Sequence, residues 1–218
     1  MTTHPTIGSP ITRTHGTLVP WVTGTLAALL VVLHVGAAGL FGDLVYDRSA
    51  ILGGDAWRLL TGHLVHLDWN HLILNVAALL GLGYLIESDG QHGRRNLLAV
   101  LGASIAAIGV ALLAFHPATI LYAGLSGALN GLFAFVCLLF FARTRSWVWI
   151  TLLAGGIFKI AWESAFGPAF SATLAWPPEA LAHFAGLFGG FAVISANFWK
   201  SARKSWYFGW AACPFNLA

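Results

Sequence analysis

Six long apolar runs, separated by short polar segments, set the pattern of this 218-residue chain. Each run comes close to the length of about 20 residues that a helix needs to cross roughly 30 Å of hydrocarbon. A β-barrel would instead show shorter segments in which apolar and polar residues alternate. The pattern therefore predicts an all-α membrane protein, a bundle of six transmembrane helices at about residues 18–41, 71–87, 97–115, 121–142, 148–166 and 179–198.

The composition supports a membrane protein and excludes several other classes. Apolar residues make up 58% of the chain and charged residues 9%, which is too apolar for an ordinary soluble domain. We expect a polar tail at 1–17, one domain at 18–198 and a second tail at 199–218. Cys137 and Cys213 form neither a disulfide framework nor a metal-ligand pattern. The net charge of +3 comes from loop and tail cations, so we expect no nucleic-acid partner.

The positions of Lys and Arg predict how the helices are oriented. Cations occur in the N-terminal tail, in the second and fourth connections and in the C-terminal tail, whereas the third and fifth connections have none. By the positive-inside rule both termini are cytoplasmic, and the second, fourth and sixth helices begin at the outer face. The residues concerned are Arg13, Arg94, Arg95, Arg143, Arg145, Lys200, Arg203 and Lys204.

Three of the predicted helices contain a polar residue at a similar depth. Ser126 lies about five residues into its run, and Asn75 and His183 lie about four residues into theirs. At 1.5 Å per residue, each is roughly 6 to 8 Å below the outer edge of the bilayer. Polar groups are costly in hydrocarbon, so their common depth indicates a functional site that water reaches from outside.

Small residues on two helices favour a close approach of Ser126 and His183. The segment Ala182–Gly190 repeats small residues at four-residue spacing, and Gly127 and Gly131 form a matching stripe. We therefore expect the imidazole within hydrogen-bonding distance of the hydroxyl, as activation of a serine nucleophile requires. No Asp or Glu stands beside either residue in its own run, which favours a catalytic dyad over a triad. The alternative is that both residues serve only helix packing.

A second polar pair predicts an oxyanion hole. His71 and Asn75 are four residues apart, on one face of a helix, and can donate hydrogen bonds to a common point together with the Ser126 amide. His63, His66 and His71 also allow a zinc or haem site as an alternative. The chain lacks an HExxH motif and a neighbouring cysteine, so we expect no metal and no cofactor. His63 and His66 are then expected to stabilise the loop.

Two charged residues lie inside the fifth run, again four residues apart. Lys159 and Glu163 would reduce the cost of each other's charge in lipid, so mutual pairing is the favoured interpretation. A weaker hypothesis is that Glu163 binds a cationic part of a substrate.

Taken in order, these residues resemble the rhomboid family of intramembrane serine proteases. The resemblance covers about residues 46–198. It implies that Ser126 is the nucleophile, that His183 is the general base and acid, and that His71, Asn75 and the Ser126 amide form the oxyanion hole. The matching features are Trp57, Arg58, His66, His71, Asn75, Glu87, the segment Gly124–Gly127, and His183 with the small residues Ala182, Gly186 and Gly190 around it.

Within that family, the six-helix form and the segment Tyr46–Asn75 look most like the rhombosortases. This resemblance implies a bacterial cytoplasmic (inner) membrane protein whose active site opens to the periplasmic side. The implied partners are the lipid bilayer and membrane-anchored protein substrates, cut near a Gly-Gly-bearing C-terminal tail with a hydrophobic helix and basic residues. The alternatives are an inactive rhomboid-like protein that binds membrane helices without cutting them and a haem- or metal-binding membrane protein.

Overall fold

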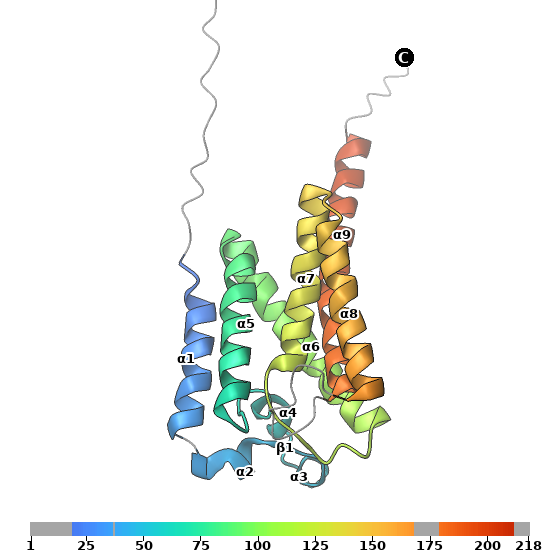
Figure 1. Ribbon diagram of the computed structural model, residues 1–218. Helices are drawn as coiled ribbons and strands as arrows, with labels where there is room; N and C mark the ends of the chain where they lie inside the picture. Colours follow the sequence, from blue (N-terminus) through green and yellow to red (C-terminus); the bar gives the residue numbers. More distant parts are fainter. Residues whose placement is uncertain (1–18, 37, 168–178, 212–218) are drawn as a thin grey trace, which may run out of the picture.

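Long helices dominate the part of the chain that the computed structural model describes, which comprises residues 19–36, 38–167 and 179–211. The helices form one bundle, with short helices and a two-stranded ladder gathered at one end (Figure 1). Within these described ranges, five helices are long and apolar enough to cross a membrane, and α1 (Trp21–Gly36) is a shorter apolar helix. The five are α5 (Trp69–Glu87), α6 (Gly90–Phe115), α7 (Ser126–Thr144), α8 (Val148–Phe166) and α9 (Ala180–Ala211). The prediction of a mostly helical membrane protein is confirmed.

The first predicted helix is shorter than its apolar run. We expected residues 18–41, but α1 has 16 residues and ends at Gly36, a residue type that often follows the last turn of a helix. The chain then continues as a 3-10 turn, η1 (Ala38–Leu40), and a single-turn helix, α2 (Phe41–Leu44). At 1.5 Å per residue α1 is about 24 Å long, which is less than the hydrocarbon thickness. The sixth membrane crossing therefore stays a prediction.

The start of the fourth predicted helix, at residue 121, is wrong. Leu121–Tyr122 is a short strand, β2, paired antiparallel with β1 (Tyr46–Asp47). Gly124 follows with a φ of +102°, a backbone conformation that interrupts any right-handed helix. Helix α7 begins only at Ser126, because the residues before it take their backbone hydrogen bonds from other segments.

The remaining bounds agree with the prediction or extend it. Helices α5 and α8 match their runs closely, whereas α6 begins earlier than predicted, at Gly90. Helix α9 continues to Ala211, so part of the segment 199–218 that we expected as a tail is helical. The predicted tail at 1–17 lies outside the described residues, as does 212–218.

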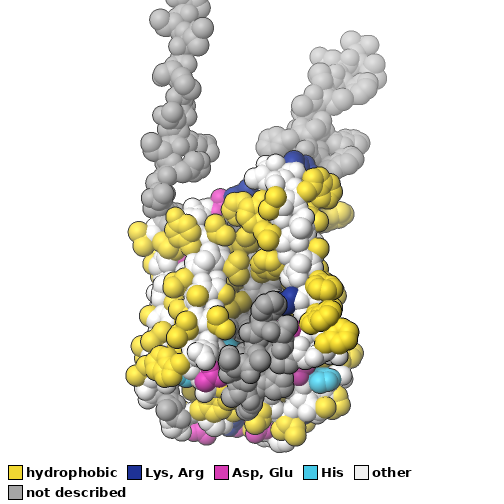
Figure 2. Space-filling model, in the orientation of Figure 1, with side chains coloured by type: hydrophobic (Ala, Val, Ile, Leu, Met, Phe, Trp, Pro, Cys, Tyr) yellow, Lys and Arg dark blue, Asp and Glu magenta, His cyan; other side chains and the backbone are white. Residues whose placement is uncertain are grey.

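The two ends of the bundle differ in structure and in charge. Helix α1 starts and helix α9 finishes at the same end, drawn at the top of Figure 1, and the short connections from α5 to α6 and from α7 to α8 lie there too. On the face shown in Figure 2, Lys and Arg gather mainly at this end, and most Asp and Glu lie at the other. This agrees with the predicted position of Arg94, Arg95, Arg143 and Arg145, whereas Arg13 and the side chains of Lys200, Arg203 and Lys204 lie outside the described part of the chain. Which side of the membrane this end faces stays a prediction.

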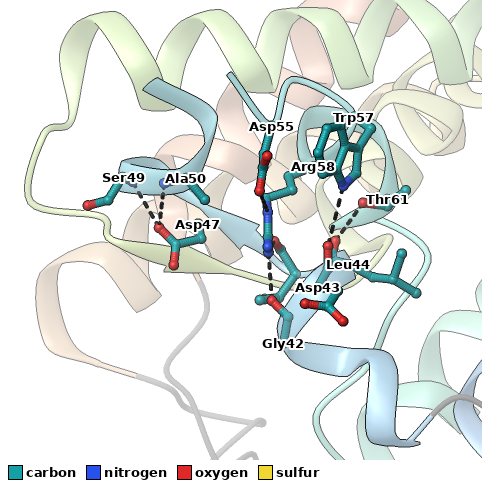
Figure 3. Close-up of polar contacts among 11 residues, drawn as sticks. Gly42, Asp43, Leu44, Asp47, Ser49, Ala50, Asp55, Trp57, Arg58 and Thr61 are labelled. Atoms are coloured by element: carbon teal, nitrogen blue, oxygen red, sulfur yellow. Dashed lines mark hydrogen bonds and ion pairs between the residues drawn. The ribbon is translucent and has the colours of Figure 1, made fainter. Parts of the chain in front are cut away.

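The long connection between α1 and α5 is held together by polar contacts (Figure 3). Arg58, in the single-turn helix α4 (Arg58–Thr61), donates from Nη1 to the carbonyls of Gly42 at 2.6 Å and Val45 at 3.1 Å. Its Nε also pairs with Asp55 at 3.0 Å. Asp47 accepts from two backbone amides at the start of α3 (Arg48–Leu52) and so caps that helix. The loop is therefore an ordered platform below the bundle.

A buried carboxylate fixes α1 to the rest of the bundle. Glu87, at the end of α5, is fully buried and accepts from the amides of Val22 at 3.0 Å and Thr23 at 2.8 Å. The Thr23 hydroxyl donates to it at 2.8 Å, and Arg94 Nε lies 3.3 Å away. The first amides of α1 have no partner within their own helix, so this carboxylate satisfies them and complements the positive end of the helix.

Helices α6, α7 and α9 pack with their backbones in direct contact. A Cβ atom on Gly186 would overlap the carbonyl group of Gly127, and one on Gly190 would overlap that of Gly131. Ser104 of α6 joins the same contact, because its hydroxyl donates to the Gly186 carbonyl at 3.0 Å. The predicted match between small-residue stripes on α7 and α9 is confirmed. Lipid tails are as apolar as the helix surfaces, so apolar burial does not drive these helices together. Close backbone contact instead stabilises the packing through dispersion attraction.

Substitution of Gly186 tests this packing. We expect Gly186→Ala to lower the apparent melting temperature of the detergent-purified protein, because the added methyl group must push α7 and α9 apart, at a cost of about 1–3 kcal/mol. Gly102→Ala is the matched control, since nothing in the described structure lies within 4 Å of a Cβ atom at this position. The packing argument is wrong if both variants melt at the wild-type temperature.

Candidate active site

Ser126 and His183 meet where α7 and α9 begin. The Ser126 hydroxyl oxygen lies 3.0 Å from His183 Nε2, within hydrogen-bonding distance. Ser126 is the first residue of α7 and His183 is in the first turn of α9, where its ring is buried. The glycine contacts between the two helices continue directly from this point. The structure therefore brings together the two residues that the sequence analysis singled out as nucleophile and base.

The backbone before Ser126 is shaped by Gly124. This glycine has a positive φ and donates its amide to the Gly62 carbonyl at 2.9 Å. The ring of His71 lies against its α-carbon, so any side chain here would overlap the imidazole. Only glycine satisfies both conditions, because it tolerates positive φ and has no Cβ atom. The result is a tight loop that presents Ser126, which is partly exposed, at the first position of α7.

The two predicted oxyanion residues lie beside the serine, on α5. Asp68 caps this helix by accepting from the His71 amide at 2.8 Å. Asn75 is buried and uses one hydrogen of its side-chain amide to donate to the His71 carbonyl at 2.7 Å. Its other amide hydrogen stays free, and its Oδ1 has no partner among the described residues. Both side chains border the same cavity as Ser126, so their role as oxyanion donors stays a prediction that the geometry allows.

A cavity of about 420 Å³ joins these groups. Its polar lining comes from α7, α8 and β2, from α5 and α9 with the residue before each, and from the connection between α6 and β2. The connection between α6 and β2 and the starts of α5, α7 and α9 lie at the end of the bundle opposite the start of α1 (Figure 1), so the cavity lies toward that end. Polar groups at the mouth favour entry of water. The polar and ionisable lining residues are Asp68, His71, Asn75, His116, Thr119, Tyr122, Ser126, Lys159, Glu179 and His183.

Two buried imidazoles and a phenol support the site from below. His66 packs its ring edge-on against His71, with the centroids 5.0 Å apart, and His63 packs against Tyr122 at 5.3 Å. Burial lowers the pKa of His63 to about 4 and that of His66 to about 3, so both rings are neutral near pH 7. Burial also raises the pKa of Tyr122, which keeps its hydroxyl protonated beside Gly127.

The described part of the chain contains no cluster of side chains that would support the alternative of a metal site. Within those residues, no three His, Cys, Asp or Glu side chains are placed to hold a metal ion. One ring nitrogen of His63 and both ring nitrogens of His66 have no hydrogen-bond partner there, and the two rings face different aromatic neighbours. The role of these two residues in stabilising the loop stays a prediction.

The charged pair in α8 forms as predicted, but Lys159 lines the cavity and Glu163 does not. Lys159 Nζ lies 2.6 Å from Glu163 Oε2. The Lys159 side chain is 48% exposed and lines the cavity, whereas the Glu163 side chain is 3% exposed and is absent from the lining. A role of Glu163 in binding a cationic substrate group stays a prediction.

Sequence reasoning missed several residues around the site. Tyr122 stands four residues before the serine, but only the strand pairing shows that its ring turns inward. His116, Thr119 and Glu179 form a chain of contacts at the mouth, with His116 Nδ1 2.5 Å from the Thr119 hydroxyl and that hydroxyl donating to Glu179 at 2.7 Å. No spacing signal connects these residues, because they come from separate segments of the chain.

The buried histidines predict a loss of stability in acid. The unfolded chain binds protons at His63 and His66 below about pH 6.5, whereas the folded protein resists protonation until about pH 4 or 3. Lowering the pH from 7 to 4.5 should therefore lower the apparent melting temperature, and the fall should be smaller in His66→Phe. The exposed His92→Phe serves as the control and should keep the wild-type pH dependence. Identical profiles for His66→Phe and the wild type would contradict this account.

Comparison with known proteins places the chain in a family. No curated protein matches it closely enough for a residue-by-residue comparison. Residues 53–200 match the rhomboid domain, a segment that contains α5 to α8 and most of α9. The matched segment is well over half of the 218-residue chain and contains every side chain that lines the cavity. The chain therefore belongs to the rhomboid family.

Proposed function

We propose that this protein is an intramembrane serine endopeptidase that uses a Ser126–His183 dyad. The observation that carries the proposal is the 3.0 Å distance between the Ser126 hydroxyl and His183 Nε2. The rhomboid family is typically one of serine proteases, and five helices of the described structure are suited to cross a membrane. A nucleophile, a base and free hydrogen-bond donors around one cavity are the groups that acyl transfer requires.

The first half of the reaction forms an acyl-enzyme. Ser126 Oγ attacks the carbonyl carbon of the scissile peptide bond while His183 Nε2 takes the hydroxyl proton. Negative charge develops on the carbonyl oxygen, and donors from His71, Asn75 and the Ser126 amide stabilise it. The tetrahedral intermediate then collapses, the C–N bond breaks, and His183 returns the proton to the departing amine.

The second half of the reaction needs water. A water molecule that enters through the polar mouth attacks the acyl carbon, and His183 takes its proton before returning it to Ser126 Oγ. Asp68, Thr119 and Glu179 line the mouth and make this entry favourable. No carboxylate that hydrogen-bonds to His183 is found among the described residues, which supports a dyad rather than a triad.

The substrates that we propose are membrane-anchored proteins with a C-terminal hydrophobic helix. The rhombosortase-like pattern of Tyr46–Asn75 favours proteins that are cut beside a Gly-Gly-bearing tail. Glycines next to the cut weaken the helix, so that a peptide bond becomes available to Ser126. The corresponding location is a bacterial inner membrane, with the cavity opening to the periplasm.

The dyad is tested by substrate release in cells. A reporter fused to a Gly-Gly motif, a hydrophobic helix and a basic tail should be released by the wild type. Ser126→Ala and His183→Ala should each lower release at least about a thousandfold, because each removes a group on which the chemistry depends. The measurement is reporter released into the medium or periplasm, normalised to the amount of enzyme in the membrane.

Two matched variants control for effects of the substitutions themselves. Ser146→Ala and His92→Ala change the same residue types away from the cavity and should release the reporter like the wild type. A serine-directed fluorophosphonate should label the wild type and not Ser126→Ala. Equal release by Ser126→Ala would remove the catalytic assignment. An unlabelled wild type that still binds the tail would favour the inactive helix-binding alternative.

The orientation is tested by cysteine accessibility. In a Cys213→Ser background, where the remaining Cys137 is buried, we expect Ala118→Cys to react with a membrane-impermeant maleimide added outside the cytoplasmic membrane. Ser146→Cys, at the other end of the bundle, should react only after the membrane is opened. The reverse pattern would place the cavity on the cytoplasmic side.

A further inference from the structure

Lys159 occupies a junction between two cavities. The first is the cavity with Ser126 and His183, and the second, of about 380 Å³, lies between α5, α7 and α8. Both are lined by Leu74, Asn75, Ser126 and Lys159. A peptide lying across Ser126 and continuing into the second cavity would therefore pass the Lys159 side chain.

The ammonium group of Lys159 is anchored but not satisfied. It has three N–H donors, and one contact goes to Glu163 at 2.6 Å. The described residues supply no further acceptor for it, although its side chain is 48% exposed and lines both cavities. Glu163 is held by the same contact, so its buried carboxylate fixes the direction of the lysine. The pair therefore presents free donors at a fixed place beside the nucleophile.

The charge of the pair indicates which acceptor suits these donors. Glu163 balances the charge of Lys159, and a second carboxylate would leave excess negative charge beside a carboxylate that is 3% exposed. A neutral carbonyl oxygen accepts the free N–H groups without that cost. Within an intact helix the backbone carbonyls are already used by the helix itself. Free carbonyls are offered only by a peptide segment that has left the helical conformation.

We propose that Lys159 is a substrate-binding residue that donates hydrogen bonds to backbone carbonyls of the unwound peptide segment next to the scissile bond. This inference rests on the proposed function and adds a basis for selecting substrates. A Gly-Gly segment, which unwinds at low cost, is favoured over a helix-forming segment of the same length. Glu163 acts through Lys159 by holding its position.

The test compares two fluorogenic peptides that share one hydrophobic tail. One carries Gly-Gly beside the cut, and the other carries Ala-Leu there. We expect Lys159→Met to lower kcat/KM for the Gly-Gly peptide about tenfold to hundredfold, mainly through KM, since a hydrogen bond to a charged group is lost. The preference for Gly-Gly over Ala-Leu should shrink in the same variant. Lys159→Arg should restore both, because it keeps the charge and the donors.

Labelling by a small fluorophosphonate separates substrate binding from structural damage, because the probe has no peptide segment for Lys159 to hold. Lys159→Met should be labelled at the wild-type rate, and the neighbouring Phe158→Leu, which lines neither cavity, should match the wild type in all assays. Unchanged kcat/KM and preference in Lys159→Met would overturn the inference, as would labelling that falls in parallel with cleavage. A wild type that is labelled but cleaves neither peptide overturns the inference alone. A wild type that is not labelled overturns the proposed function and the inference with it.

Discussion

The backbone contact between α7 and α9 is the interaction on which the rest of this structure depends. Ser126 and His183 belong to different helices, and their 3.0 Å separation exists only because Gly127 and Gly186 let the two backbones touch. A side chain at Gly186 would meet the Gly127 carbonyl and move the histidine away from the serine. Since lipid is as apolar as the helix surfaces, close packing rather than apolar burial must hold these helices together.

Polar groups in the bundle differ in how far their hydrogen-bonding capacity is used. Glu87, which fixes α1, accepts hydrogen bonds from Val22 and Thr23. Among the described residues, Asn75 and Lys159, which line the cavity, keep a free Oδ1 and free ammonium donors. An unsatisfied polar group is costly away from water, so their concentration around one hydroxyl marks the place where a ligand is expected.

The location of the site followed from sequence, although one step of that reasoning was wrong. We inferred a common depth for Ser126, Asn75 and His183 from an assumed helix start at residue 121. The helix starts at Ser126, and the five residues before it form a strand and a tight loop. The residues still meet, because the pairing of β2 with β1 and the fit of Gly124 against His71 set where α7 begins. Pairing between distant segments has no signature in a local apolar run.

The sequence by itself determined the helices, the glycine stripes and the pairing of Lys159 with Glu163, because run length and i, i+4 spacing are local properties. Only the tertiary structure decided that Tyr122 turns toward the serine and that Lys159, rather than Glu163, faces the cavity. A helix that is apolar on all sides gives little indication of which face points inward. Its rotation is set by the packing of its neighbours, and that information is spread over the whole chain.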